Sequence, residues 1–173
     1  GGSQTNSALE LIFGYNGFGR LTGDETGSIG GGGGAIGQWG PTGLGRLFNA
    51  SFGGQASWLL PAALVLLAAL LLMTLRRRRT DRLRGSALIW GSWLVATALT
   101  ISLSKGIIHE YYTVALAPAI GALVGIGVVE LWRRRAHPAA SVALALASLV
   151  TVIWSVVLLG RSADWQPWLR PTV

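Results

Sequence analysis

The sequence of 173 residues contains no cysteine, one lysine and one methionine. Without cysteine the chain can form neither a disulfide framework nor a reactive thiol. Charged residues are also missing from long stretches, because segments 57–75, 85–104, 113–132 and 139–159 together carry only Glu130. These absences exclude thiol chemistry and point away from an ordinary water-soluble surface.

The four uncharged segments predict membrane spans. Each has about the 20 residues that a helix needs to cross a hydrocarbon core of roughly 30 Å. None shows the polar face of a soluble core helix. The sequence therefore predicts an all-α, polytopic membrane bundle of four transmembrane helices over residues 57–159.

Arginines orient this bundle. Loops 76–84 and 133–135 hold nine arginines, and with Asp81 and Glu130 they account for the whole net charge of +7. By the positive-inside rule both loops face the cytoplasm, which leaves 1–56, 105–112 and 160–173 extracytoplasmic in the cell membrane. Topology and membrane lipids explain this basic balance better than nucleic acid does.

Two outer regions flank the spans. Residues 1–56 form a glycine-rich extracytoplasmic region with an unbroken glycine run at 30–34. Within it we expect a short helix over 6–13, capped by Asn6 or Ser7. Residues 42–52 are expected to form either a second helix along the membrane surface or a plain juxtamembrane linker. The tail 160–173 is rich in tryptophan, and we expect it to lead into a further span, with more of the protein upstream.

Between the second and third spans lies a polar cluster, Lys105, His109, Tyr111 and Tyr112. Its position at a span end places these side chains at the depth of lipid headgroups. An ammonium and phenolic hydroxyls are suited to holding a phosphate. The cluster is therefore the candidate site for chemistry on a phosphate carried by a lipid.

The third predicted span carries Gly121, Gly125 and Gly127, whose small size allows another helix to approach closely. We expect Gly121 and Gly125 to be packing positions, and Glu130 to pair with Arg134. One histidine beside Glu110 is too little for a metal site, so no metal ligand is assigned. Nothing indicates a cofactor, although the sequence leaves a divalent metal open.

Several blocks resemble bacterial glycosyltransferase family 39, in particular an actinobacterial branch related to aminoarabinose and protein mannosyl transferases. These blocks are Phe13-Gly14-Tyr15-Asn16-Gly17-Phe18-Gly19-Arg20-Leu21-Thr22-Gly23, Trp39-Gly40-Pro41, residues 55–61, and Lys105-Gly106-x-x-His109-x-Tyr111-Tyr112-Thr113 through Pro118-Ala119-Ile120. The resemblance covers nearly the whole chain as the later part of such a protein. Its most specific block runs from Lys105 to Pro118.

The resemblance implies a multi-span enzyme that transfers a sugar from a polyprenyl-phosphate donor to an extracytoplasmic acceptor. The donor phosphate would be held by Lys105 and by Tyr111 or Tyr112, and His109 would orient the phosphate or shuttle a proton. Glu110 departs from the family, which commonly has proline there. The essential aspartate is expected upstream of these residues, so this fragment alone should be inactive. The missing transmembrane helices of the same protein would be its partners.

Two other readings stay open. A non-enzymatic scaffold or assembly subunit needs only four spans with basic loops. A lipid-linked sugar transporter would place polar groups at the middle of its spans, where this sequence is almost purely aliphatic. The sugar, the acceptor, the catalytic base and the oligomeric state cannot be read from the sequence.

Overall fold

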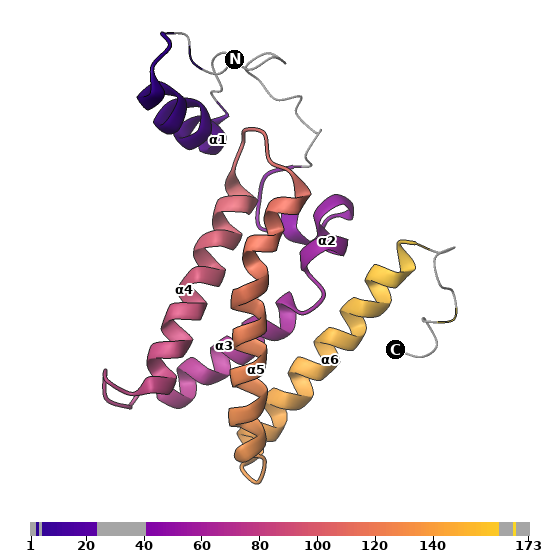
Figure 1. The fold of residues 1–173 in the computed structure, drawn as a ribbon. Helices are drawn as coiled ribbons and strands as arrows, with labels where there is room; N and C mark the ends of the chain where they lie inside the picture. Colours follow the sequence, from indigo (N-terminus) through magenta and orange to yellow (C-terminus); the bar gives the residue numbers. More distant parts are fainter. Residues whose placement is uncertain (1–2, 4, 24–40, 163–167, 169–173) are drawn as a thin grey trace.

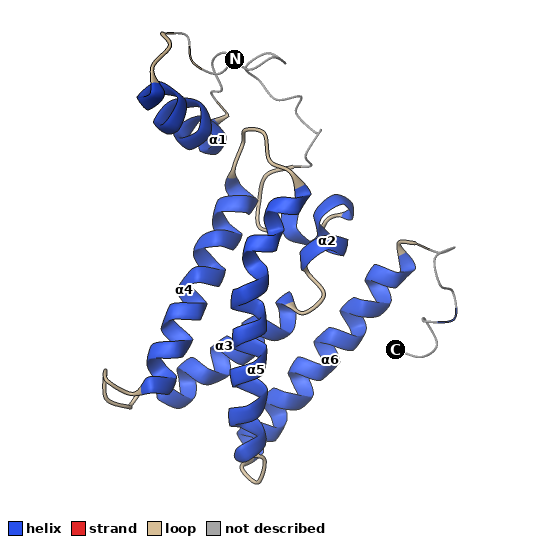
Figure 2. Ribbon diagram, viewed as in Figure 1, coloured by secondary structure: helices blue, strands red, loops and turns tan. Residues whose placement is uncertain are grey.

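Every element that the computed structural model describes is helical (Figure 2), which confirms the predicted all-α class. The structure describes residues 3, 5–23, 41–162 and 168. In chain order the elements are η1 (Glu10–Phe18, a π-helix), α1 (Gly19–Thr22), η2 (Arg46–Phe48, a 3₁₀-helix), α2 (Ala50–Ala56), α3 (Leu60–Thr74), α4 (Arg82–Leu103), η3 (Glu110–Leu116, a 3₁₀-helix), α5 (Ala117–Arg133) and α6 (Pro138–Gly160).

Three stretches are long and apolar enough to span a membrane: α4, η3 with α5, and α6, of 22, 24 and 23 residues. The first predicted span is different. α3 has 15 residues, which gives a length of about 22 Å against a hydrocarbon core of about 30 Å. A bend of 61° separates α3 from α2. The span predicted over 57–75 is therefore present as one helix but is shortened to Leu60–Thr74, and it has the length of a fourth span only if the bent pair α2 and α3 counts as one.

The break between α2 and α3 has a local cause. The Ser57 hydroxyl donates to the Gly53 carbonyl (2.7 Å), and the Trp58 indole N–H donates to the Gly54 carbonyl (2.8 Å). The Trp58 bond satisfies a carbonyl that a continuing helix would have used itself, whereas the Gly53 carbonyl also accepts the Ser57 N–H of the last turn (3.1 Å). Pro61 follows at the start of α3, where its missing N–H is tolerated.

α3 lies in the middle of the bundle and contacts α4, α5 and α6 (Figure 1). Its side chains Leu66, Leu67 and Leu70 are buried. Leu67 and Leu70 belong to a cluster with α4 and α5, whereas Leu66 joins a second cluster with α5 and α6. Hydrophobic contact along one short helix therefore connects the three longer ones.

Two glycines allow these helices to come close to α3. A Cβ at Gly127 of α5 would lie 2.8 Å from the Cβ of Leu66, and one at Gly91 of α4 would lie 2.7 Å from Cδ1 of Leu67. Both distances are shorter than van der Waals contact allows. The packing on α3 therefore requires glycine at position 127, where the contact is with a Cβ, whereas a Cβ at position 91 would displace the end of the Leu67 side chain.

The glycines singled out from the sequence have a different environment. Within the described part of the chain, a Cβ at Gly121 or Gly125 would meet no atom within 4 Å outside its own helix. The close approach on α5 is made by Gly127 alone of the three. Packing at Gly121 and Gly125 stays a prediction, for a partner outside the described residues.

The N-terminal helices differ from their predicted bounds. The helix expected over 6–13 starts at residue 8 and continues through η1 and α1 to Thr22. The Ser7 hydroxyl accepts from the Glu10 N–H (3.4 Å), in agreement with Ser7 as one of the two predicted caps. The glycine run 30–34 lies outside the described residues.

The helix expected over 42–52 is broken into η2 and α2 at Asn49. Asn49 has an extended backbone, and its side chain caps α2 by accepting from the Phe52 N–H (2.8 Å). Leu47 and Phe52 are buried in the main core, while Leu44 is 70% exposed. The expectation of one surface helix is therefore wrong, because the capping asparagine ends one turn and its apolar neighbours pack inward.

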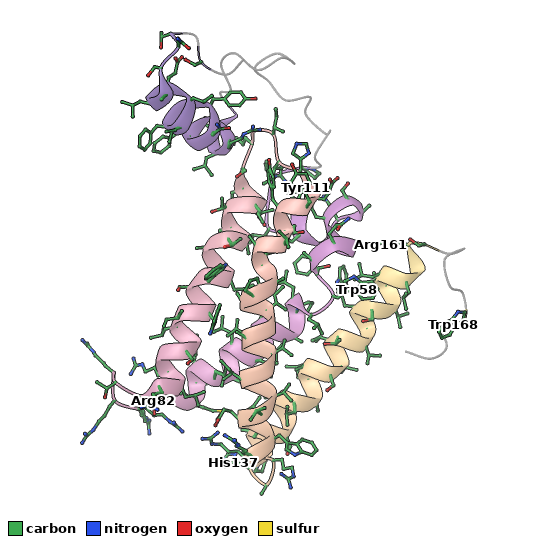
Figure 3. The ribbon with its side chains drawn as sticks, viewed as in Figure 1. Trp58, Arg82, Tyr111, His137, Arg161 and Trp168 are labelled. Carbon is green, nitrogen blue, oxygen red and sulfur yellow. The ribbon has the colours of Figure 1, made fainter. Side chains whose placement is uncertain are left out.

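The two arginine loops lie at one end of the bundle. Figure 3 shows Arg82 and His137 at that end, and Tyr111 and Arg161 at the opposite end. Glu130 pairs with Arg134 as predicted, and also with Arg133 (3.1 Å). The arrangement agrees with the expected topology, while the membrane face that each end meets stays a prediction.

Alanine substitutions test the packing on α3. Gly127→Ala should destabilise the protein by ~1–3 kcal/mol, because the new Cβ meets a Cβ that cannot rotate away. Gly121→Ala should be neutral or stabilising by up to ~1 kcal/mol through helix propensity. Thermal unfolding of the detergent-solubilised full-length protein measures both. The reverse ranking would show that the Gly121 face carries the tighter packing.

Cysteine labelling tests the sidedness. Single cysteines at Ser86 and Ser162 lie near opposite ends, and the chain contributes no native cysteine to the background. Since moving nine arginines across a bilayer is unfavourable, Ser162→Cys should react with an impermeant thiol reagent in whole cells and Ser86→Cys should not. Labelling of position 86 alone would reverse the orientation.

Candidate functional site

The predicted polar cluster lies on the connection between α4 and η3, at the end opposite the arginine loops (Figure 3). α4 ends at Leu103, and Ser104 takes an extended conformation. His109, also extended, precedes η3. The backbone therefore leaves helical geometry between Ser104 and His109, so the loop needs other partners for its polar groups.

The N-terminal helix supplies these partners. The N–H groups of Lys105 and Gly106 donate to the carbonyls of Leu21 (3.2 Å) and Arg20 (2.9 Å) at the end of α1. In return, Nη1 of Arg20 donates to the Ile107 carbonyl (3.1 Å). Residues more than 80 positions apart in sequence thus hold the loop in place.

Gly23 completes this contact. It has φ +86°, the left-handed conformation that commonly ends a helix and that favours glycine. A Cβ at Gly23 would lie 3.2 Å from the Cβ of Lys105. A larger residue would therefore be strained and would press on the lysine stem.

Arg46 holds the start of the Lys105 loop at the end of α4. It is 3% exposed, and its Nη1 donates to the carbonyls of Ile101 (3.0 Å) and Ser104 (2.6 Å). Burial lowers the pKa of this guanidinium, which nevertheless stays charged because arginine does not deprotonate in proteins. A cation at the last carbonyls of a helix is favourable. Arg46 therefore fixes the point where α4 ends and the Lys105 loop begins.

Lys105 itself is exposed. Among the described residues its ammonium makes no hydrogen bond or ion pair, while its backbone is held on both sides. The side chain is consequently available to an anionic ligand. Its backbone is held two residues after the C-terminal end of α4, which is the helix end where the sequence places it.

The other three predicted site residues form one aromatic group. The ring of His109 stacks on Tyr111 (centroids 5.1 Å apart) and meets Tyr112 edge-on (5.6 Å). Tyr111 and Tyr112 are also edge-on to each other, at 4.8 Å. The structure thus brings His109, Tyr111 and Tyr112 together, with Lys105 on the same loop.

The two tyrosines open onto different hollows. Tyr112 lines a cleft of about 790 Å³ between η1, α1, α4 and the loop. Tyr111 lines a second cleft of about 450 Å³ beside Trp58 and Gly121. Lys105 and His109 are not among the lining residues of either cleft. Of the four predicted residues, Tyr112 is therefore the one in the larger cleft.

The larger cleft combines polar and apolar walls. Its polar lining residues include Asn16, Arg20, Thr97 and Thr100, and its apolar lining residues include Phe13, Phe18, Leu21, Ile101, Ile107 and Ile108. A surface of this kind is suited to a ligand with a polar head and a hydrocarbon tail. α4, which contributes Thr97, Thr100 and Ile101 to this lining, is one of the helices long and apolar enough to span a membrane.

Sequence reasoning missed Arg20 and Arg46 as functional residues. Arg20 lies in the block of residues 13–23 that carries the family resemblance, so a signal was present. Arg46 carried no signal beyond an isolated charge before an apolar pair. Its role depends on a helix end 55 residues away in sequence.

No metal centre is found in the part of the chain that the structure describes, where no three His, Asp or Glu side chains lie close together. Glu110, which departs from the family pattern, is half-buried at the start of η3. The acidic residues Asp24 and Glu25 lie outside the described residues.

Comparisons with known proteins identify two relatives, both from Bacillus subtilis (strain 168). The protein named "Putative mannosyltransferase YycA" is 30% identical over 240 aligned residues, which cover 92% of this chain and 34% of the relative. The protein named "Putative mannosyltransferase YkcB" is 40% identical over 87 residues, which cover 50% of this chain and 12% of the relative. The chain thus spans about a third of the length of the first.

No protein-family model and no solved structure matches the chain. The alignment with the first relative covers nearly the whole chain, so it includes most of the spanning helices and of the candidate site. The apolar helices mark it as a membrane protein. The chain is therefore related in sequence to glycosyltransferases and has the architecture of a membrane protein.

Proposed function

We propose that this chain is the later part of a membrane glycosyltransferase of the family 39 type, in its actinobacterial branch. The enzyme takes a sugar from a polyprenyl-phosphate donor and passes it to an acceptor outside the cytoplasm. One observation carries the proposal: the exposed ammonium of Lys105 lies on the loop that borders an amphipathic cleft at the end of a spanning helix. The mannosyltransferase names of the relatives support it.

The transfer breaks the bond between the anomeric carbon and the phosphate oxygen of the donor, and it forms a bond from the acceptor oxygen to that carbon. Negative charge builds on the departing phosphate. A fixed ammonium and a hydroxyl donor stabilise such charge best in a site shielded from water. Lys105 supplies the first and Tyr112, which lines the cleft, supplies the second.

His109 and Tyr111 have supporting roles in this proposal. The stack of His109 on Tyr111 limits the rotation of both rings and holds Tyr112 edge-on. Tyr111 instead lines the second cleft. Tyr112 is therefore proposed as the phosphate ligand of the pair, with His109 as its positioning residue.

The lipid tail of the donor would follow the apolar wall of the larger cleft. Ile101, Ile107 and Ile108 border this wall on the side of α4 and the loop. The acceptor proton requires a base, and we place that base on an upstream part of the protein. Other transmembrane helices of the same protein would complete the site.

A non-enzymatic scaffold is the second candidate. The packed ring cluster and the bond from the Trp93 indole to the Ala115 carbonyl (2.9 Å) would serve an interfacial anchor equally well. A transporter has less support, because the buried residues of the spanning helices are almost all apolar. Activity measurements separate the enzyme from the scaffold.

Replacing Lys105 by methionine tests the phosphate role. Lys105→Met keeps the stem and removes the charge. The activation free energy of transfer should therefore rise by ~2–4 kcal/mol, which lowers the transfer rate about 30- to 1000-fold. Arginine at this position should rescue only partly, because its planar fork is not a point charge. The assay is sugar transfer from a synthetic polyprenyl-phosphate donor by the purified full-length protein in lipid.

Arg78→Met is the matched control, since it removes one exposed cation from the opposite end of the bundle. It should leave transfer unchanged, and thermal unfolding of both variants should match the parent. Near-normal transfer by Lys105→Met would contradict the role of Lys105 in phosphate binding and would favour the non-enzymatic scaffold.

The tyrosine pair gives a second, independent test. Tyr112→Phe should lower transfer by about 1 kcal/mol, roughly five-fold, for one hydrogen bond. Tyr111→Phe keeps its ring stacking and should have little effect, because its side chain lines the other cleft. Equal losses in the same assay would contradict the separate roles of the two hydroxyls.

A further inference from the structure

A third cavity lies at the arginine-loop end, far from the proposed donor site. It has a volume of about 370 Å³ and is formed between α3, α5 and α6. Its walls are apolar, built from Ala69, Leu72, Met73, Leu131, Ala139, Ala140 and Ala143. Leu72 is 69% exposed, so part of this apolar lining is open to the surroundings of the bundle.

Basic side chains complete the lining of this cavity. Arg77 follows α3, Arg134 ends α5 and His137 precedes α6. Each of the three helices thus contributes an end, and each end brings one basic residue. Figure 3 shows His137 at the same end of the bundle as Arg82.

Carboxylates neutralise these arginines only in part. Arg77 pairs with Asp81 (3.0 Å) and Arg134 pairs with Glu130, which Arg133 also contacts. Hydrogen bonding, chiefly from the Arg84 backbone N–H, lowers the pKa of Asp81, so that carboxylate is ionised at neutral pH. Two carboxylates face nine arginines in these loops, which leaves a charge of +7 at this end.

Four other arginines of the first loop do not line the cavity. Among the described residues, no hydrogen bond or ion pair involves the side chains of Arg76, Arg78, Arg79 and Arg82. Arg77 is held differently, because the Arg84 guanidinium donates to its carbonyl (2.9 Å). The Arg134 guanidinium likewise donates to the Glu130 carbonyl (3.0 Å). Both arginines that line the cavity are therefore held in place, each by an ion pair with a carboxylate.

We propose that this cavity binds one anionic phospholipid. Its phosphate would lie between Arg77, Arg134 and His137, and an acyl chain would follow Leu72 and Met73 toward the hydrocarbon core. A basic pocket between transmembrane helices is suited to an anionic headgroup. The apolar walls favour a lipid over free phosphate, because only a lipid would cover them. The proposal is independent of the glycosyltransferase activity.

Lipid binding to the purified full-length protein tests this site. The probes are fluorescent phosphatidylglycerol and phosphatidylcholine in detergent micelles, and the readout is the ratio of their affinities. A double variant, Arg77→Gln with Arg134→Gln, should lower the preference for phosphatidylglycerol by roughly 30-fold, about five-fold for each arginine.

The control pair Arg79→Gln with Arg135→Gln removes the same charge from the same two loops, at positions outside the cavity lining. It should lower the preference clearly less. An equal loss in the two pairs would overturn the proposal, because it would mean that the general field of the loops attracts the lipid.

A size change provides a test that keeps every charge. Ala139→Phe should fill the cavity and weaken phosphatidylglycerol binding, whereas Ala136→Phe, exposed on the adjoining loop and outside the lining, should not. Unchanged binding by Ala139→Phe would overturn the acyl-chain placement. Inorganic phosphate should compete only weakly, and full displacement at millimolar phosphate would show a plain anion site instead.

Discussion

The close packing of three helices on α3 is the constraint on which the rest of this structure depends. α3 is too short to span a bilayer alone, yet its leucines are the shared surface of both hydrophobic clusters. Gly91 and Gly127 let α4 and α5 approach it, and a methyl group at Gly127 would push α5 away. The positions of α4 and α5 in turn decide where the loop between them lies. Hydrophobic contact along one helix therefore sets the geometry at both ends of the bundle.

At the end with the Lys105 loop, polar contacts refine what packing has brought together. Arg46 bonds the last carbonyls of α4, and the end of α1 bonds the N–H groups of the loop. A buried cation at a helix end is stable because it meets carbonyl dipoles instead of water. The lysine stem is thus anchored while its ammonium is exposed, an arrangement suited to a ligand that arrives from the membrane.

Much of the fold could be predicted from the sequence, and the errors have physical causes. The last three spans follow from apolar length alone, since a long uncharged run has few other stable states in lipid. The first span is shorter than predicted, because a break in the helix at residues 57–59 leaves only Leu60–Thr74 for α3. Periodicity contains no signal for such a break. The helix expected over 42–52 failed similarly, because Asn49 caps a new helix there.

The sequence by itself determined the helical class, the three longer spans, the charge asymmetry and the residue types of the candidate site, because these depend on composition and local order along the chain. Only the tertiary structure decided which glycine of α5 is in close contact, that Tyr111 and Tyr112 open onto different clefts, and that Arg20 and Arg46 hold the Lys105 loop. These facts arise from contacts between residues distant in sequence. Such contacts depend on how helices pack, which no local pattern of side chains specifies.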